Sequence, residues 1–226
     1  MRFKAVLFDM DGVVADTMPL HREVWRRFAA SHGVPRTLEE LRPLDGRRAG
    51  DIVELLLGER DPDRVNTLAE AREALYRDLL ATATVEAVTG VRELLAWLGD
   101  RRIPRVLATS ATPENVEQVL GPLGLRGAFE GVVSSVDVTR GKPDPEVYVR
   151  AAGRAGVTPG DCLVIEDALP GVEAACAAGA TCLGLTTSLA EGPLRAAGAR
   201  WVVPDLHVAT ILALPEVGAS EAAGAP

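Results

Sequence analysis

The sequence contains few cysteines, few aromatic residues and no long hydrophobic run. Its three cysteines, Cys162, Cys176 and Cys182, form no CxxC pair and stand among apolar or small residues, which indicates neither a disulfide framework nor a zinc site. We expect all three to be buried free thiols, as suits a reducing cytoplasm. No apolar stretch approaches the length of a membrane span, and the first apolar run is too short for a signal peptide. The sequence therefore predicts a cytoplasmic protein without a membrane partner.

Basic residues are also in deficit, with 24 Lys and Arg against 32 Asp and Glu and a net charge of −8. Nucleic acids and anionic membranes attract basic surfaces and repel acidic ones, so we expect no nucleic-acid partner and favour a small molecule. The hydrophobic fraction of 47% and the charged fraction of 25% are typical of globular chains. A length of 226 residues suits one α/β domain with an insertion, and we expect a monomer or a weak dimer.

Apolar residues alternate between strand-like and helix-like patterns over most of the chain. Short apolar runs at 4–8, 105–109, 131–134, 163–166 and 181–185 predict strands, with a weaker one around 201–203. Helical spacing occurs at 91–98, 114–120, 146–155 and 171–178. Alternating strands and helices predict a doubly wound, Rossmann-like parallel sheet wrapped by helices.

The segment between the first strand and residue 88 is helical in pattern throughout. A helix is predicted from about Pro19 to Gly33, followed by helical stretches at 38–41, 52–57 and 64–81. The predicted fold class is therefore α/β, with a core formed by residues 1–16 and 89–214 and a helical cap of residues 17–88 inserted after the first strand. The tail, 215–226, is rich in Ala, Gly and Pro, and we expect it to be flexible.

Polar side chains follow four of the predicted strands. They are Asp9 and Asp11, Thr109 and Ser110, Lys142, and Glu166 and Asp167. Ligands of open α/β sheets bind outside the carboxyl ends of the strands, so we expect these groups to converge on one crevice. Carboxylates provide the oxygen ligands that Mg²⁺ prefers, while a lysine and hydroxyls suit phosphate. Two neighbouring carboxyls also titrate differently, which allows one to act as a base and the other as an acid.

Each of these motifs alone also fits a purely structural role. The DxDG sequence is typical of a tight turn, and Thr109 with Ser110 is typical of a helix N-cap. Lys142 fits a solvent-exposed loop, and Glu166 with Asp167 fits the start of a helix. Only the joint arrangement favours phosphoryl transfer.

The chain resembles the haloacid dehalogenase superfamily, in the branch that contains β-phosphoglucomutase and many small-molecule phosphatases. The segments FDMDGVVADT, LATSAT, GKPDPEVY and VIEDALPGVEAACAAG match the four family motifs in order, over nearly the whole chain. The resemblance implies Asp9 as the nucleophile, Asp11 as the general acid and base, Thr109 as a hydroxyl that holds phosphate, and Lys142 as the cation beside the phosphoryl oxygens. It also implies a Mg²⁺ ion held by Asp9, the Asp11 main-chain carbonyl, Glu166 and Asp167.

The resemblance further implies which side chains meet the substrate. They are His21, Trp25, Gly46, Arg47 and Arg72 from the cap, with Ser110 and Ala111 from the core. Trp25 also fits the apolar stripe of its helix, and Arg72 also fits a solvated helix charge. The expected activity is hydrolysis of a small phosphorylated metabolite, such as a sugar phosphate, through an aspartyl phosphate on Asp9. Asp11 argues against a haloacid dehalogenase proper, whose reaction has no alcohol leaving group to protonate.

A phosphomutase of the β-phosphoglucomutase type stays open as an alternative. The mutase pattern has Lys before the cap glycine and Arg three residues after it, where this chain has Asp45 and Ala49. It has Lys-Asn in the second motif, where this chain has Thr-Pro at 112–113. An acid where a second phosphate should lie is unfavourable, although Arg47 and Arg48 could compensate.

A third hypothesis is a receiver-like binding module that is phosphorylated on Asp9 as a signal. The helical insertion directly after the first strand and the second acid, Asp11, argue against it.

Overall fold

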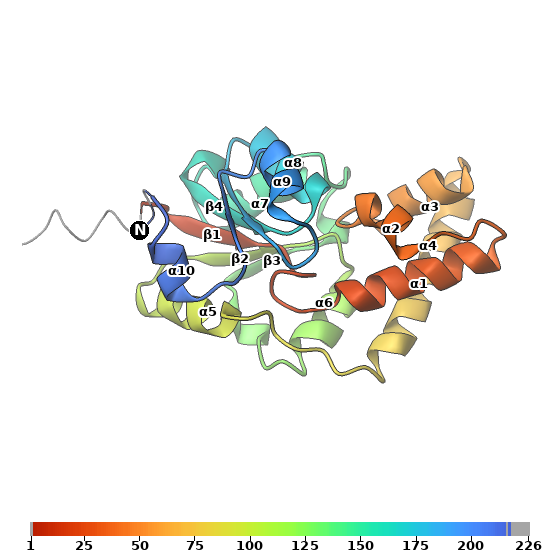
Figure 1. Cartoon of the computed structure of the whole chain (residues 1–226), viewed down its shortest axis with the longest axis horizontal. Coiled ribbons are helices and arrows are strands. Elements are labelled where there is room, and N and C mark those ends of the chain that lie inside the picture. The colour runs from red at the N-terminus through yellow and green to blue at the C-terminus, as the bar shows by residue number, and fades with distance from the viewer. Residues whose placement is uncertain (1, 216, 218–226) are drawn as a thin grey trace, which may run out of the picture.

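The computed structural model describes residues 2–215 and 217, and its central feature is a six-stranded parallel sheet (Figure 1). The strands are β1 (Ala5–Phe8), β2 (Arg105–Ala108), β3 (Gly131–Val133), β4 (Cys162–Glu166), β5 (Thr181–Leu185) and β6 (Trp201–Val203). Their order across the sheet is β3-β2-β1-β4-β5-β6, so β1 pairs with β2 on one side and with β4 on the other. The order reverses between β1 and β4, which is where doubly wound sheets form their ligand crevice.

Helices cover both faces of this sheet. One face is covered by α5 (Val91–Asp100), α6 (Pro113–Leu120) and α10 (Val208–Leu212), and the other by α7 (Glu146–Arg154), α8 (Leu169–Ala177) and α9 (Glu191–Ala196). Alternate residues of β1 point to opposite faces, since Val6 and Phe8 belong to one buried cluster and Ala5 and Leu7 to the other. The predicted doubly wound α/β core is confirmed.

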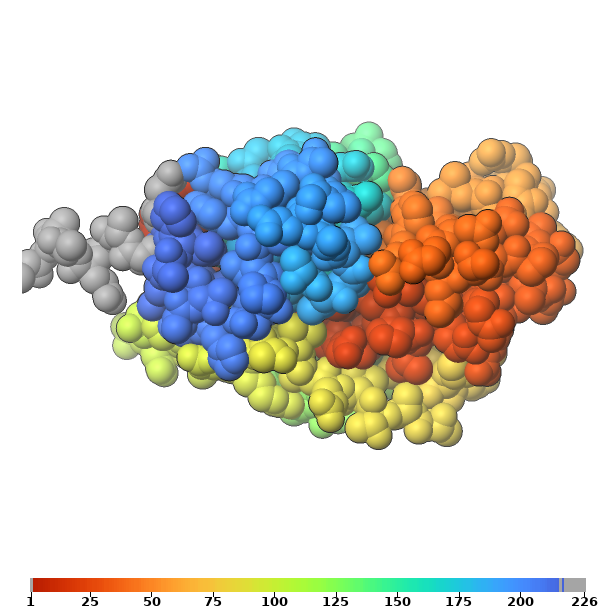
Figure 2. Space-filling model, in the orientation of Figure 1, coloured from red at the N-terminus to blue at the C-terminus, as the bar shows by residue number. Residues whose placement is uncertain are grey.

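The cap consists of α1 (Met18–Ser31), α2 (Leu38–Leu41), α3 (Ala49–Leu57) and α4 (Pro62–Leu80). It lies beyond one end of the sheet, at the right of Figure 1, and the space-filling view shows it packed against the core (Figure 2). A third buried cluster, which includes Trp25, Phe28 and Val53, gives it a core of its own. Two of the cap helices begin at side-chain caps: Thr37 forms a capping box at α2, and the Asp61 side chain caps α4.

The predicted elements are all present, with ends displaced by a few residues. For example, α3 begins at Ala49 rather than at 52, and α8 begins at Leu169 rather than at 171. Short 3-10 turns connect some elements, at Arg42–Leu44, Arg126–Ala128, Ser135–Asp137 and Pro159–Asp161. The chain enters and leaves the cap side by side, because the Asp16 amide donates to the Glu86 carbonyl at 2.9 Å and the Val88 amide to the Val14 carbonyl at 3.1 Å.

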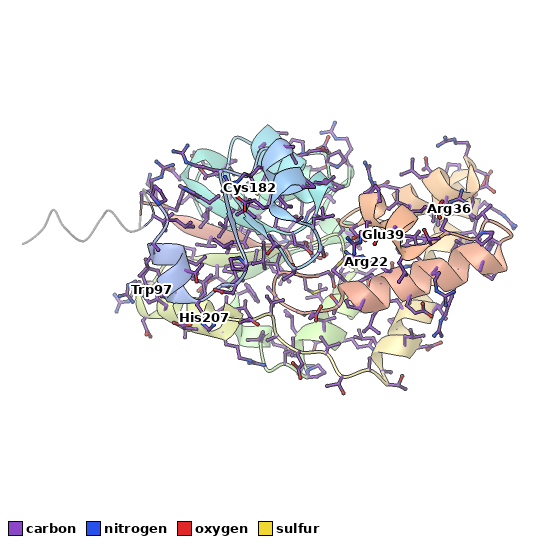
Figure 3. The ribbon with its side chains drawn as sticks, in the orientation of Figure 1. Arg22, Arg36, Glu39, Trp97, Cys182 and His207 are labelled. Carbon is purple, nitrogen blue, oxygen red and sulfur yellow. The ribbon has the colours of Figure 1, made fainter. Side chains whose placement is uncertain are left out.

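The cysteines are free, but they are not all buried. Cys162 and Cys182 are buried, and Cys182 lies within the sheet layer (Figure 3), whereas Cys176 is exposed. The expectation of three buried thiols is therefore wrong for Cys176, which stands on the outward face of α8. None of the helices that the structure describes combines the length and the apolar character needed to cross a membrane. The predicted flexible tail lies outside the described residues except for positions 215 and 217.

Candidate active site

Lys142 joins two acids that lie far apart in the sequence. Its Nζ donates to Asp9 Oδ1 at 2.8 Å, to Glu166 Oε1 at 2.7 Å and to the Ala108 carbonyl at 3.2 Å. The lysine is only 1% exposed, so it is not the solvated loop residue that its motif alone would allow. The ends of β1, β2 and β4 thus meet around one buried ammonium group, as the sequence predicts.

Three carboxylates gather beside this lysine. Ligand oxygens of Asp9, Glu166 and Asp167 all lie within 4.8 Å of one another, and all three residues are buried. Burial raises the pKa of Asp9 to about 7, although Lys142 opposes the rise. Burial, together with the charges of Glu166 and Asp9, also raises the pKa of Asp167 well above its usual range. Three buried acids exceed the charge of one lysine, so without a further cation the cluster holds protons, as the raised pKa values of Asp9 and Asp167 indicate.

The residues fit a hard divalent cation. Asp167 Oδ1 is buried and has no hydrogen-bond partner among the described residues, and carboxylate oxygens are the ligands that such cations prefer. Gly12 makes room for this carboxylate, because its φ is +80° and a Cβ there would lie 1.9 Å from Asp167 Oδ2. Thr187 fixes the same loop by donating to the Gly12 carbonyl at 2.6 Å.

Glu166 is occupied by protein donors on both oxygens. Oε1 accepts from Lys142 and from the Tyr148 hydroxyl at 2.5 Å, and Oε2 accepts from the main-chain amides of Asp167 at 3.0 Å and Ala168 at 3.3 Å. Glu166 therefore anchors Lys142 in the geometry described here. Sequence reasoning missed Tyr148, whose spacing on α7 signals only a core residue.

Asp11 points away from the acid cluster and toward the cap. Its Oδ1 accepts from the Thr17 hydroxyl at 2.5 Å and contacts His21 Nε2 at 3.2 Å. Burial alone would raise the pKa of Asp11, but His21, Thr17 and Arg72 together hold it below its usual value. Arg72 contacts His21 Nδ1 at 2.8 Å and lies over the Trp25 ring, 4.6 Å from its centroid. It is 2% exposed, so the explanation of a solvated helix charge is wrong.

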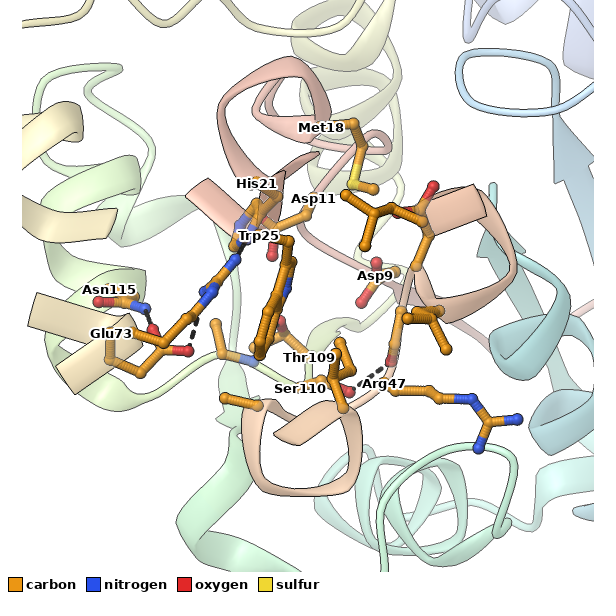
Figure 4. Close-up of a pocket in the computed structure, with 18 residues that line it drawn as sticks. Asp9, Asp11, Met18, His21, Trp25, Arg47, Glu73, Thr109, Ser110 and Asn115 are labelled. Carbon is orange, nitrogen blue, oxygen red and sulfur yellow. Dashed lines mark hydrogen bonds and ion pairs between the residues drawn. The ribbon is translucent and has the colours of Figure 1, made fainter. Parts of the chain in front are cut away.

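A pocket between cap and core contains most of the predicted site residues (Figure 4). From the core come Asp9, Asp11, Thr109, Ser110 and Ala111, and from the cap His21, Trp25, Gly46, Arg47 and Arg72. Lys142, Glu166 and Asp167 do not line it. Asp45 and Ala49, which the sequence analysis placed where a mutase would hold its second phosphate, also line it, and sequence reasoning missed Met18, Leu41, Leu44, Ile52, Glu73 and Asn115. The cavity measures about 50 Å³, less than a usual ligand pocket, so the cap lies close against the core in this structure.

The core and cap loops that meet at this pocket are joined by hydrogen bonds. The Ser110 hydroxyl donates to the Gly46 carbonyl at 2.7 Å, and the Thr109 hydroxyl accepts from the Ala111 amide at 3.1 Å. Thr109 is 1% exposed, and its hydroxyl donates to no acceptor among the described residues. A buried hydroxyl in the same pocket as Asp9 suits an anionic oxygen.

The charged residues around the cap glycine are largely paired. Asp45 accepts from Arg22 Nη2 at 2.6 Å and from Nε at 3.0 Å, and Arg48 pairs with Asp51 and also donates to the Thr139 carbonyl. Arg47 makes no ion pair within residues 2–215, and its Nε is buried without a partner. One unpaired guanidinium therefore remains on this side of the pocket.

Comparisons with known proteins agree with this geometry. Residues 3–179 match the family model described as haloacid dehalogenase-like hydrolase. The chain is 36% identical over 186 residues to validoxylamine A 7'-phosphate phosphatase of Streptomyces hygroscopicus subsp. limoneus, covering 82% of this chain and 87% of that one. It is 35% identical over 182 residues to fructose-1-phosphate phosphatase of Escherichia coli, covering 79% and 94%. The structure of β-phosphoglucomutase from Clostridium difficile superposes with a TM-score of 0.81 at 24% identity, covering 91% and 92%.

A crevice lined by acids at the switch point of a capped parallel sheet, with a buried lysine, defines an enzyme of the phosphohydrolase class. The chain belongs to the haloacid dehalogenase-like hydrolases. This confirms the resemblance drawn from the four motifs, including its β-phosphoglucomutase-like and phosphatase branch. Membership of this family leaves the hypothesis of a receiver-like binding module without support.

Proposed function

We propose that this phosphatase is Mg²⁺-dependent and hydrolyses a small phosphate monoester, such as a sugar phosphate, through an aspartyl phosphate on Asp9. The observation that carries the proposal is the Asp9 carboxylate, which lines the pocket under the cap and is bound at 2.8 Å to the buried Lys142. The similarity of the chain to a fructose-1-phosphate phosphatase supports a phosphorylated sugar as the substrate.

The side chains divide the reaction between them. Asp9 attacks phosphorus in line with the leaving oxygen, while Lys142 balances the charge of the phosphoryl oxygens and Thr109 donates a hydrogen bond to one of them. The pKa of Asp11 is low in this geometry, so Asp11 must carry a proton when the ester is bound: it gives that proton to the departing alcohol and, as a carboxylate, then takes one from the water that hydrolyses the aspartyl phosphate. Acid–base assistance of this kind is worth ~10²–10⁴ in rate.

The acid cluster provides the ligands for the metal. Asp9, Asp167 and the Asp11 main-chain carbonyl would hold Mg²⁺, with Glu166 bound directly or through water. The ion would supply positive charge that offsets the negative charge on the transferring phosphoryl group. The unpartnered Asp167 Oδ1 supports this assignment.

The helices of residues 17–88 act as the cap of a core formed by residues 1–16 and 89–214. In the closed position they exclude water from the first step. The cap residues His21, Trp25, Gly46, Arg47 and Arg72 line the pocket and select the leaving group, together with Ser110 and Ala111 of the core.

Charge pairing in the cap favours a hydrolase over a phosphomutase. A mutase must hold a second phosphate, which needs free cations. In this cap Arg22 is already paired with Asp45, and Arg48 is already paired with Asp51. Among the described basic side chains that line the pocket, His21 pairs with Asp11 and Arg72 with Glu73, which leaves Arg47 without an ion pair. One guanidinium offers less charge than a bound bisphosphate requires.

A panel of phosphorylated metabolites, scored in Mg²⁺ for both phosphate release and isomerisation, tests this proposal. Asp9→Asn should release no phosphate, whereas Asp16→Asn, a change at an exposed acid of the same loop, should retain activity. Phosphate release by Asp9→Asn would exclude the aspartyl phosphate, and isomerisation faster than release would show a mutase.

A further inference from the structure

A chain of hydrogen bonds runs from the core helix α6 through the cap to Asp11. Asn115 Nδ2 donates to Glu73 Oε2 at 2.5 Å, and Glu73 Oε1 accepts from Arg72 Nη1 at 2.9 Å. Arg72 Nη2 then lies 2.8 Å from His21 Nδ1, and His21 Nε2 lies 3.2 Å from Asp11 Oδ1. Figure 4 shows Asn115 and Glu73 joined at one side of the pocket, with His21 close to Asp11.

The chemistry of arginine fixes the direction of these bonds. A guanidinium only donates hydrogen bonds, so His21 Nδ1 must offer a lone pair to Arg72. The ring is then neutral and carries its proton on Nε2, which donates to Asp11. The other tautomer, or a ring protonated on both nitrogens, would set an N–H against the guanidinium.

The position of Arg72 depends on both the cap and the core. Its guanidinium lies over Trp25 and Tyr76, and its charge is balanced by Glu73 next to it in α4. Glu73 is in turn held by Asn115, a core residue that is 1% exposed. The whole chain of bonds is therefore complete only when the cap lies against α6.

The bonds to Asp11 determine how its carboxylate faces the pocket. Thr17 and His21 both contact Oδ1, so together they set the direction of Oδ2, which is left for the substrate. If His21 turned, one of the two restraints on this carboxylate would be lost.

We infer that Glu73 and Asn115 are positioning residues, which hold Arg72 so that His21 donates to Asp11 when the cap is closed on the core. The inference rests on the proposed role of Asp11 as general acid and base. It makes the Glu73–Asn115 contact the link between cap closure and the orientation of the proton-transfer group.

Two substitutions at Glu73 separate this role from simple packing. Glu73→Ala removes both bonds. Glu73→Gln can retain both bonds: its side-chain carbonyl accepts from Arg72, and its amide group donates to Asn115 Oδ1 once the Asn115 amide has turned over. Asn115 Oδ1 is available for this bond because it has no partner among the described residues. Gln118→Ala is the matched control, because Gln118 Nε2 donates to the Arg77 carbonyl at 3.0 Å and so also joins α6 to α4 without touching Arg72.

The first readout is the ¹⁵N chemical shifts of the two ring nitrogens of His21 in ¹H–¹⁵N NMR spectra. A His21→Gln variant identifies these signals among those of the three histidines. The wild type, Glu73→Gln and Gln118→Ala should show an unprotonated Nδ1 and a protonated Nε2, and Glu73→Ala should show exchanging tautomers. The second readout is kcat, which should fall about 10- to 100-fold in Glu73→Ala and stay within about 3-fold of wild type in the other two.

Identical His21 signals in wild type and Glu73→Ala would overturn the inference, as would averaged tautomers in the wild type. An equal loss of kcat in Gln118→Ala and Glu73→Ala would also overturn it, because that result indicates cap docking alone. If no ester released phosphate at all, the proposed function would fail, while the His21 signals would still decide whether Glu73 positions the ring.

Discussion

Replacement of the nucleophile, Asp9→Asn, should stabilise the protein at pH 8 when no divalent metal is present. Burial is the largest cause that raises the pKa of Asp9 from 3.8 to about 7, with Lys142 opposing it and Glu166 and Asp11 adding to it. In the unfolded chain the same carboxyl titrates near its ordinary value. At pH values between 3.8 and about 7, the folded protein keeps a proton on Asp9 that the unfolded chain releases. The free energy of unfolding therefore falls as the pH rises through this range.

The size of the effect follows from this interval. From pH 5 to pH 8 the Asp9 titration should remove about 3 kcal/mol from the free energy of unfolding of the wild type. Asparagine has nearly the same shape and does not titrate, so the variant avoids this loss. The pKa of Asp167 is also raised, in part by the charge of Asp9, so the difference between the two proteins reports Asp9 together with its effect on Asp167.

Urea denaturation in a metal chelator, at four pH values from 5 to 8, measures this difference. The two proteins should unfold with nearly equal free energies at pH 5, and Asp9→Asn should be the more stable at pH 8. Asp16→Asn, an exposed change, should follow the wild type. Parallel curves for wild type and Asp9→Asn would refute the reasoning and show that Lys142 keeps Asp9 ionised throughout.

Three further predictions concern the same cluster. Mg²⁺ added after chelation should raise the urea midpoint at pH 8, because an ion that binds only the folded state stabilises it. The rise should be much smaller in Asp167→Asn, which lacks one of the ligands, and equal shifts in the two proteins would place the ion elsewhere. Lys142→Met should cost about 3–5 kcal/mol in the same assay, since it leaves Asp9 and Glu166 without their buried cation, and a neutral outcome would contradict that pairing. Gly12→Ala should cost about 1 kcal/mol or more and weaken Mg²⁺ binding measured by calorimetry, because its Cβ would overlap Asp167; unchanged affinity would argue against this contact.

The fold and the central cluster could be predicted because their signals are local and their geometry is general. Short apolar runs and helical spacing recur along the chain, and each run ends at a residue that stands at the carboxyl end of its strand. Parallel strands place all these ends along one edge, so Asp9, Thr109 and Glu166 had to lie near one another once the sheet was predicted. Lys142 follows the third strand and reaches the same edge.

The partners across the cap could not be predicted in this way. Glu73 looks like a surface charge of a helix, Asn115 lies in the first turn of another helix, and their sequence positions carry no sign that they touch. The ion pair of Arg22 and Asp45 could not be predicted either, because nothing in the sequence indicates that these two residues touch. Such contacts depend on how each helix is rotated and how the cap docks, which local periodicity does not determine.

The sequence by itself therefore determined the order of the elements, the insertion of a helical cap and the identity of the acids, hydroxyl and lysine at the strand ends. Only the tertiary structure decided that Tyr148 and Lys142 hold Glu166, and that Asp11 turns toward the cap rather than toward the acid cluster. The physical reason is that backbone pattern sets where a side chain begins, whereas packing between separate elements sets which partner it reaches.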